Sequence, residues 1–219
     1  MPLPSMFRIL LLQNDAVVAE HLHSAIEGTA DMAVSGLTTT LAQAARSMMV
    51  SPPDLVLVDL QLGKAGFETL LEDLCGHSRG TRPLVLAGAL SLDDPALMQA
   101  ISQGADGYYL HDSPTLVLQD AIRQALGGES PMAPRIARQV KAHFETPAWS
   151  GAGFDIDTRD ALRLSELQLR MLARICDGYL VHEIAREMQT TPHEIGVGIR
   201  TLYRKLQLDR RAAAMARTH

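Results

Sequence analysis

Five short apolar runs alternate with segments of helical periodicity over residues 7–128 of this 219-residue chain. The runs are rich in Val, Leu and Ile, and in the segments after them apolar residues recur every three or four positions. The runs span 7–13, 32–37, 54–60, 83–90 and 107–112, and the helical segments span 16–28, 41–49, 67–75, 94–104 and 115–128. This alternation predicts an α/β domain over residues 1–127, built as a doubly wound (βα)5 parallel sheet with helices on both faces.

The rest of the chain shows no strand pattern. Residues 128–160 are rich in Pro, Gly, Ser and Asp, which predicts a linker with one short helix at 136–144. Residues 161–219 contain helical periods separated by DGY, QTTP and QLD, which predicts a small all-α domain of four helices. We expect its last helix to be short, over 209–218, with Asp209 as its cap.

Composition narrows the class of protein. The formal net charge is −5, with 9 Lys and Arg against 16 Asp and Glu in residues 1–149, and 11 against 9 in residues 150–219. The mildly basic second part is compatible with a polyanion partner. Cys75 and Cys176 stand far apart, as is typical of a reducing compartment. Because the apolar runs are far shorter than a membrane span, we expect a cytoplasmic protein with no membrane partner.

The carboxylate of Asp59 lies near the end of the central apolar run, within PPDLVLVDL at residues 52–60. A stretch of Leu and Val that follows two prolines is typical of a strand buried on both faces of a parallel sheet. Such sheets bind ligands beyond the carboxyl ends of their strands, so Asp59 lies where chemistry is expected. The alternative is a carboxylate that only caps the following loop.

The chain resembles response regulators of the NarL/FixJ class, in which a receiver domain precedes a LuxR-type helix-turn-helix domain. The resemblance rests on PDLVLVDL, GADGYYLHD and AIRQALGGES in the first part and on LYRKL near the end. It implies a receiver fold for residues 1–127 and a DNA-binding domain for residues 161–219. It also implies that Asp59 stands at the phosphoacceptor position and Tyr108 at the position of a switch aromatic.

Several pocket positions depart from that class, in which an acidic pair binds Mg²⁺ and a hydroxyl and a lysine hold the phosphoryl group. Those positions hold Gln13 with Asn14, or Asn14 with Asp15 after a one-residue shift, then Ala87 and His111. A single carboxylate beside Asp59 would bind Mg²⁺ weakly. His111 is a conditional substitute, cationic only below about pH 6.5, or else a neutral hydrogen-bonding residue. We therefore expect a degenerate, atypical receiver with no cofactor, doubtful Mg²⁺ binding and no dependence on Asp59 phosphorylation.

An enzymatic role for Asp59 is the other interpretation. A phosphatase of the haloacid dehalogenase type also ends a strand with a nucleophilic Asp, but it needs a second Asp two positions later, where this chain has Gln61. The sequence contains no glycine-rich phosphate loop, serine-centred elbow or metal-ligand cluster. We expect no enzymatic activity.

The segment after QTTP is the expected DNA reader. Thr191, Pro192 and Glu194 form a capping pattern for a helix over 193–206. Gly196 and Gly198 interrupt that helix and carry no group that can contact a base. The remaining candidates for DNA contact are Thr191, His193, Val197, Arg200, Thr201, Arg204, Lys205 and Arg211. An ordinary solvated basic stripe is the alternative for Arg200, Arg204 and Lys205.

The leading functional hypothesis is a transcription regulator that binds double-stranded DNA, as a homodimer by analogy with the family. A protein partner or a small ligand at the receiver-like domain would supply the input. One alternative is an interaction protein with little specific affinity for DNA, which uses the apolar patch Tyr179, Leu180 and Val181. A second alternative is an ordinary response regulator controlled by phosphorylation.

Overall fold

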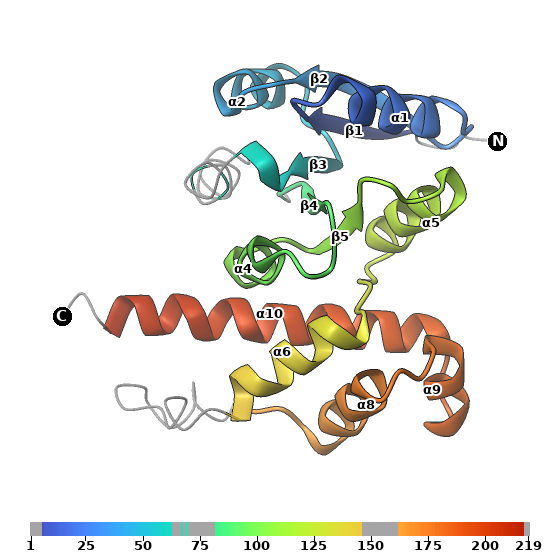
Figure 1. Cartoon of the computed structure of the whole chain (residues 1–219), viewed down its shortest axis with the longest axis vertical. Coiled ribbons are helices and arrows are strands. Elements are labelled where there is room, and N and C mark those ends of the chain that lie inside the picture. Colours follow the sequence, from blue (N-terminus) through green and yellow to red (C-terminus); the bar gives the residue numbers. More distant parts are fainter. Residues whose placement is uncertain (1–5, 63–66, 68, 70–81, 146–161, 217–219) are drawn as a thin grey trace. The chain divides into compact units, whose positions relative to one another are not determined.

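The structure is a computed structural model of the chain that describes residues 6–62, 67, 69, 82–145 and 162–216. It divides into two compact units, Met1–Gly127 and Gly128–His219, and each is described by itself (Figure 1). The helix expected over 67–75, with Cys75, lies almost wholly outside the described residues. So does the second half of the expected linker, from residue 146.

A parallel five-stranded sheet forms the centre of the first unit, which confirms the predicted α/β fold. Its strands follow the order β2-β1-β3-β4-β5, and they are β1 (Phe7–Leu12), β2 (Met32–Thr38), β3 (Leu55–Asp59), β4 (Leu84–Ala89) and β5 (Gly107–Leu110). Every residue of β3 is buried, as expected for a central strand of a sheet covered on both faces. In a sheet of this order the chain reverses direction across the sheet between β1 and β3, the place where such folds bind ligands.

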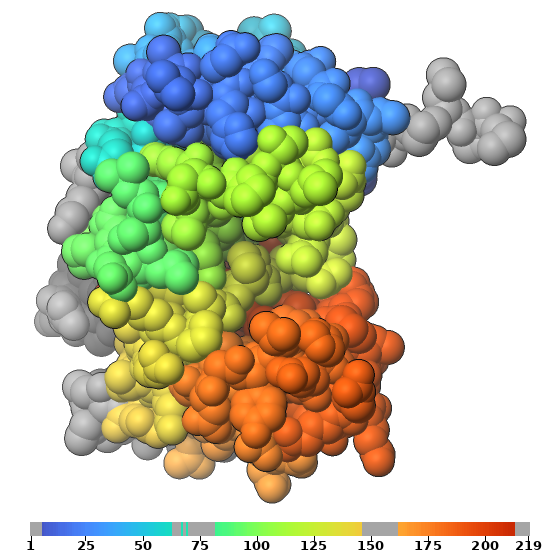
Figure 2. All heavy atoms as spheres, turned by 45° about the vertical axis from the view of Figure 1, so that its right-hand side comes forward, coloured from blue at the N-terminus to red at the C-terminus, as the bar shows by residue number. Residues whose placement is uncertain are grey.

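Helices cover both faces of this sheet. They are α1 (Ala16–Glu27), α2 (Leu41–Val50), α4 (Pro95–Gln103) and α5 (Thr115–Leu126), and a short 3-10 turn, η1 (Leu60–Leu62), follows β3. Figure 1 shows α1 and α5 on one side of the sheet and α2 and α4 on the other. The space-filling view shows α1, in blue, beside α5, in yellow-green (Figure 2). Leu22 and Ile26 from α1 and Leu118 and Ile122 from α5 bury the strand residues on that face.

The second unit is helical and consists of α6 (Pro134–Glu145), α8 (Glu166–Cys176), α9 (Val181–Glu187) and α10 (Pro192–Ala216). Helix α6 packs against α8, and α10 packs against α8 and α9. The helix expected within the linker is therefore α6, and it shares the core of this unit through Ile136, Ala137 and Val140. No helix in the described part of the chain has the length and apolarity needed to cross a bilayer.

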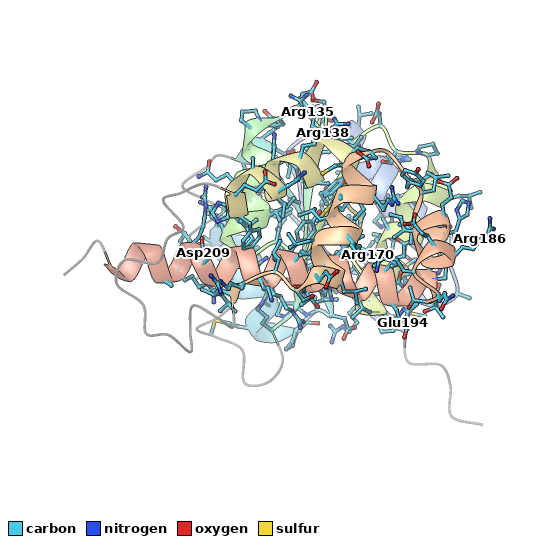
Figure 3. The ribbon with its side chains drawn as sticks, turned by 90° about the horizontal axis from the view of Figure 1, so that it is seen from below. Arg135, Arg138, Arg170, Arg186, Glu194 and Asp209 are labelled. Atoms are coloured by element: carbon cyan, nitrogen blue, oxygen red, sulfur yellow. The ribbon has the colours of Figure 1, made fainter. Side chains whose placement is uncertain are left out.

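The C-terminal helix differs from the prediction. A recognition helix over 193–206 and a separate last helix over 209–218 were expected, but α10 continues without a break from Pro192 to Ala216 (Figures 1 and 3). The expected break at QLD contains neither Gly nor Pro, so nothing stops the helix there. Asp209 is not a cap: it is buried in the middle of the helix, where Oδ2 lies 2.7 Å from Nε2 of His143 on α6.

Candidate functional site

Asp59 lies buried at the carboxyl end of β3, with 3% of its surface exposed. Its Oδ1 accepts a hydrogen bond from the backbone N–H of Gln61 at 2.8 Å. Nε2 of His111, also buried, lies 3.5 Å from the same oxygen. The 3.5 Å separation is within ion-pair range, but Nε2 makes no hydrogen bond to a described residue. Asp59 is thus enclosed by protein groups rather than presented as an open nucleophile.

Tyr109 fills the space beside this carboxylate. Asp59 pairs in register with Gly88 on β4, and Gly88 pairs with Tyr109 on β5. A Cβ atom added to Gly88 would collide with the Tyr109 hydroxyl and would lie 2.9 Å from Nε2 of His111. Only glycine at position 88 leaves room for the Tyr109 ring at the carboxyl ends of the strands. Sequence reasoning missed both Gly88 and Tyr109 as members of the pocket.

Ala87 and Tyr108, the positions predicted for the switch, lie on neighbouring strands of the sheet. Ala87 precedes Gly88 on β4 and pairs with Val58 and Tyr108. Because successive side chains of a strand point to opposite faces, Ala87 and Tyr108 face away from the side of the sheet that holds Asp59 and Tyr109. Both are buried. The prediction that Ala87 takes the hydroxyl position is therefore wrong, and Gly88 stands opposite Asp59.

Three buried polar atoms near the carboxyl ends of the strands lack a hydrogen-bond partner among the described residues. They are Nε2 of Gln13, the hydroxyl of Tyr109 and Nε2 of His111. Burial raises the pKa of Tyr109 far above its ordinary value, and the nearby charge of Asp59 raises it further. The Tyr109 hydroxyl therefore stays protonated and neutral. The pocket combines the Asp59 carboxylate with the neutral hydroxyl of Tyr109, the amide of Gln13 and the imidazole of His111.

The side chains after β1 make local contacts. Oε1 of Gln13 accepts the backbone N–H of Asp15 at 2.8 Å, and Asp15 caps α1 by accepting the N–H groups of Val17 and Val18. Asn14 is exposed. The described residues contain no group of three acidic, His or Cys side chains that suits a metal ion.

The second unit contains a helix-turn-helix formed by α9 and α10. Residues 188–191 make the turn between them, which includes Gln189 at φ 54°. The capping box predicted at the start of α10 is present: the backbone N–H of Thr191 donates to Oε2 of Glu194 at 2.9 Å, and the N–H of Glu194 donates to Oγ1 of Thr191 at 3.1 Å. The hydroxyl of Thr190, and then the backbone N–H and hydroxyl of Thr191, donate to the Glu194 carboxylate and lower its pKa. The turn therefore fixes where α10 begins.

One row of side chains along α10 faces solvent. It consists of residues at successive turns of the helix, each exposed or half-buried, and we call it the exposed row: His193, Val197, Thr201, Arg204, Leu208 and Arg211. Four of the predicted DNA contacts besides His193 lie on it. Figure 3 shows Arg186 projecting from α9 near the start of α10, where Glu194 lies. The exposed row carries two arginines, both in its C-terminal half.

Arg200 and Lys205 are not part of the exposed row. Arg200 is buried, and its Nε donates to Oγ of Ser130 at 3.2 Å. Lys205 is half-buried and donates to the backbone carbonyl of Arg163, and burial lowers its pKa. The expected basic stripe of Arg200, Arg204 and Lys205 is thus wrong as a surface feature. Arg200 packs against residues before α6, a contact between distant segments that a helical pattern does not reveal.

The chain is similar in sequence to bacterial transcription regulators. No protein-family model matches the chain. It is 25% identical over 215 residues to the transcriptional regulatory protein LiaR of Bacillus subtilis, covering 98% of this chain and 97% of LiaR. It is 27% identical over 216 residues to the nitrate/nitrite response regulator protein NarL of Escherichia coli K12, covering 96% and 94%. The chain has homologues among response regulators of the NarL type.

Solved structures agree on the fold. RcsB of Salmonella enterica serovar Typhimurium, bound to the promoter P1flhDC with phosphomimetic BeF3⁻, matches with a TM-score of 0.52 at 16% identity, covering 92% of each chain. A LuxR-family response regulator from Aurantimonas matches with a TM-score of 0.53 at 24% identity, covering 64% of this chain and 98% of its own. The α/β unit followed by a helical unit is therefore the fold of response regulators.

Proposed function

We propose that this protein is a DNA-binding transcriptional regulator of the response-regulator type whose activity does not require phosphorylation of Asp59. DNA binding is proposed from the exposed row on α10, which is the second helix of a helix-turn-helix. In such motifs the second helix enters the major groove with its N-terminal residues toward the base edges. The similarity to NarL and LiaR over nearly the whole chain supports the same proposal.

The side chains of the exposed row divide by chemistry. Arg204 and Arg211 carry positive charge and suit phosphate oxygens, which sets register and affinity without reading sequence. Val197 suits a thymine methyl group, and His193 lies where base edges are expected. Thr201 donates its hydroxyl to the carbonyl of Val197 at 3.0 Å and so has less to offer DNA. Sequence reading would therefore concentrate near the start of α10.

Independence from phosphorylation is proposed from the surroundings of Asp59. Phosphoryl transfer to a carboxylate depends on a divalent cation and on fixed donors around the transferred group. Here the space in front of Gly88 holds the neutral hydroxyl of Tyr109, and Asp15 is occupied in capping α1. A phosphoryl group on Asp59 would have to displace the buried ring of Tyr109, and the position after β5 that holds a lysine in the resembled class is His111. Asp59 instead acts as a buried structural carboxylate beside His111.

The partners of the protein would be double-stranded DNA and a second copy of the chain. Helix-turn-helix dimers bind two half-sites separated by about one helical turn of DNA. The signal would reach the first unit as a protein partner or a small ligand, since Gln13 and Asn14 stand where a phosphate switch carries its acidic pair.

Selection of genomic DNA by the purified, untreated protein tests this function. We expect the retained fragments to share an inverted repeat without any phosphodonor. Uniform retention that vanishes at physiological salt would contradict the proposal, because nonspecific binding depends steeply on salt. That result would favour the protein-interaction hypothesis, for which Tyr179, Leu180 and Val181 are indeed exposed.

A further inference from the structure

Gly196 lies where Glu129 covers the recognition helix. The three nearest atoms that an added Cβ at position 196 would meet all belong to Glu129: Oε2 at 2.6 Å and Cβ and Cγ at 2.8 Å each. Any larger residue at position 196 would therefore push the Glu129 side chain away. Gly196 has a low intrinsic helix propensity, but its missing side chain leaves room on α10 for the carboxylate of Glu129.

The segment Glu129–Pro131, just before α6, is anchored along one side of α10. The backbone N–H of Ser130 donates to the carbonyl of Gly196 at 3.1 Å. The hydroxyl of Tyr203 donates to the carbonyl of Pro131 at 2.7 Å. Ser130 and Tyr203 are both buried. Removing the segment would uncover these groups, so Glu129 is held on the helix by its neighbours as well as by its own contacts.

The carboxylate of Glu129 is oriented by His193 of the exposed row. Nδ1 of His193 lies 2.9 Å from Oε1 of Glu129. Because an ionised carboxylate only accepts hydrogen bonds, Nδ1 is the donor. Oε2, the carboxylate oxygen farther from His193, is the atom nearest to position 196, and 23% of the Glu129 side chain is exposed. An oriented acceptor therefore lies beside the N-terminal half of α10.

We propose that Glu129 is a specificity-determining residue of the DNA interface and takes the place of the side chain missing at Gly196. The inference rests on the proposed function, since it requires the start of α10 to face the major groove. In that groove a glutamate accepts from the N4 amino group of cytosine. His193 holds the carboxylate in position, and the reading surface combines α10 with the segment before α6. This assignment gives a helix with two glycines a means of reading sequence.

The experiment is DNA selection with the full-length wild type and the variants Glu129→Ala, Gly196→Ala and Glu145→Ala. Glu145→Ala is the matched control, because it removes the same charge from an exposed site at the far end of α6. We expect the wild type to prefer C·G at one position of each half-site. Glu129→Ala and Gly196→Ala should reduce that preference about tenfold or more, and Glu145→Ala should leave it unchanged.

The contact itself has a readout that does not involve DNA. Gly196→Ala should lower the denaturation midpoint in the wild-type background and raise it in Glu129→Ala, where alanine finds room in the helix. An unchanged base preference in Glu129→Ala would overturn the inference. So would an equal gain of affinity for all sequences, which would make Glu129 a general repellent of DNA. A wild type that enriches no common site would instead overturn the proposed function, and the inference with it.

Discussion

The hydroxyl of Tyr109 occupies the space that a side chain at position 88 would need. Gly88 stands opposite Asp59 in the sheet, and the ring of Tyr109 reaches it from β5. The space beside Asp59 at the carboxyl ends of the strands is thus occupied by the side chain of Tyr109. The relationship predicts how the pocket responds to substitution, and it bears directly on whether Asp59 can work as a phosphate switch.

Replacing Gly88 with Ala or Ser should destabilise the first unit rather than restore a phosphate switch. Overpacking a dense interior costs about 1–3 kcal/mol. The cost should be smaller in a Tyr109→Leu background, because the colliding hydroxyl and ring are gone. A double-mutant cycle of urea denaturation measures this coupling. Additive effects of the two substitutions would contradict the contact.

Tyr109 should also make the protein sensitive to alkali. Its folded pKa is raised by burial above the ordinary value of 10.0, so the unfolded chain loses this proton first. The unfolding free energy is then unaffected below pH 10 and falls above it, by up to about 1.4 kcal/mol per pH unit. Tyr109→Phe should remove this loss, whereas Tyr179→Phe, at an exposed site, should not. Denaturation between pH 8 and pH 11 compares them.

Arg204 and Arg200 should behave differently although both are arginines of α10. Arg204→Ala should weaken binding to all DNA sequences alike and reduce the slope of log affinity against log salt by about one. Arg200→Ala should instead lower the unfolding free energy by about 1–3 kcal/mol, because it removes a buried hydrogen bond to Ser130. Arg170→Ala, an exposed cation of α8, is the control. A full salt-slope effect from Arg200→Ala would contradict its burial.

The pair His143 and Asp209 should contribute to the stability of the helical unit. Their contact at 2.7 Å joins α6 to the middle of α10 and is largely shielded from solvent. Asp209→Asn should lower the unfolding free energy by about 1–3 kcal/mol. Glu145→Gln, which disturbs only an exposed pair with Lys141 at 3.8 Å, should cost less than about 1 kcal/mol. Equal effects of the two substitutions would show that Asp209 is not a tertiary contact.

Local patterns predicted the fold well and the site only in part. Alternation of strand and helix periods located all five strands, because that signal depends on neighbouring residues. The register between strands depends on residues far apart in the sequence, which is why Ala87 was assigned to the pocket instead of Gly88. The contacts of Glu129 with Gly196 and of Ser130 with Arg200 join segments more than 60 residues apart. No local pattern encodes them, so Arg200 was expected on the surface.

Whether Asp59 controls DNA binding is tested by the affinity of the full-length protein and of Asp59→Asn for a selected DNA site, each with and without a phosphodonor and Mg²⁺. We expect four dissociation constants that agree within about twofold. The contrary result is a wild type that binds at least about tenfold more tightly after phosphodonor treatment, with the gain lost in Asp59→Asn. That result would show that Asp59 is a working phosphate switch despite Tyr109 and His111.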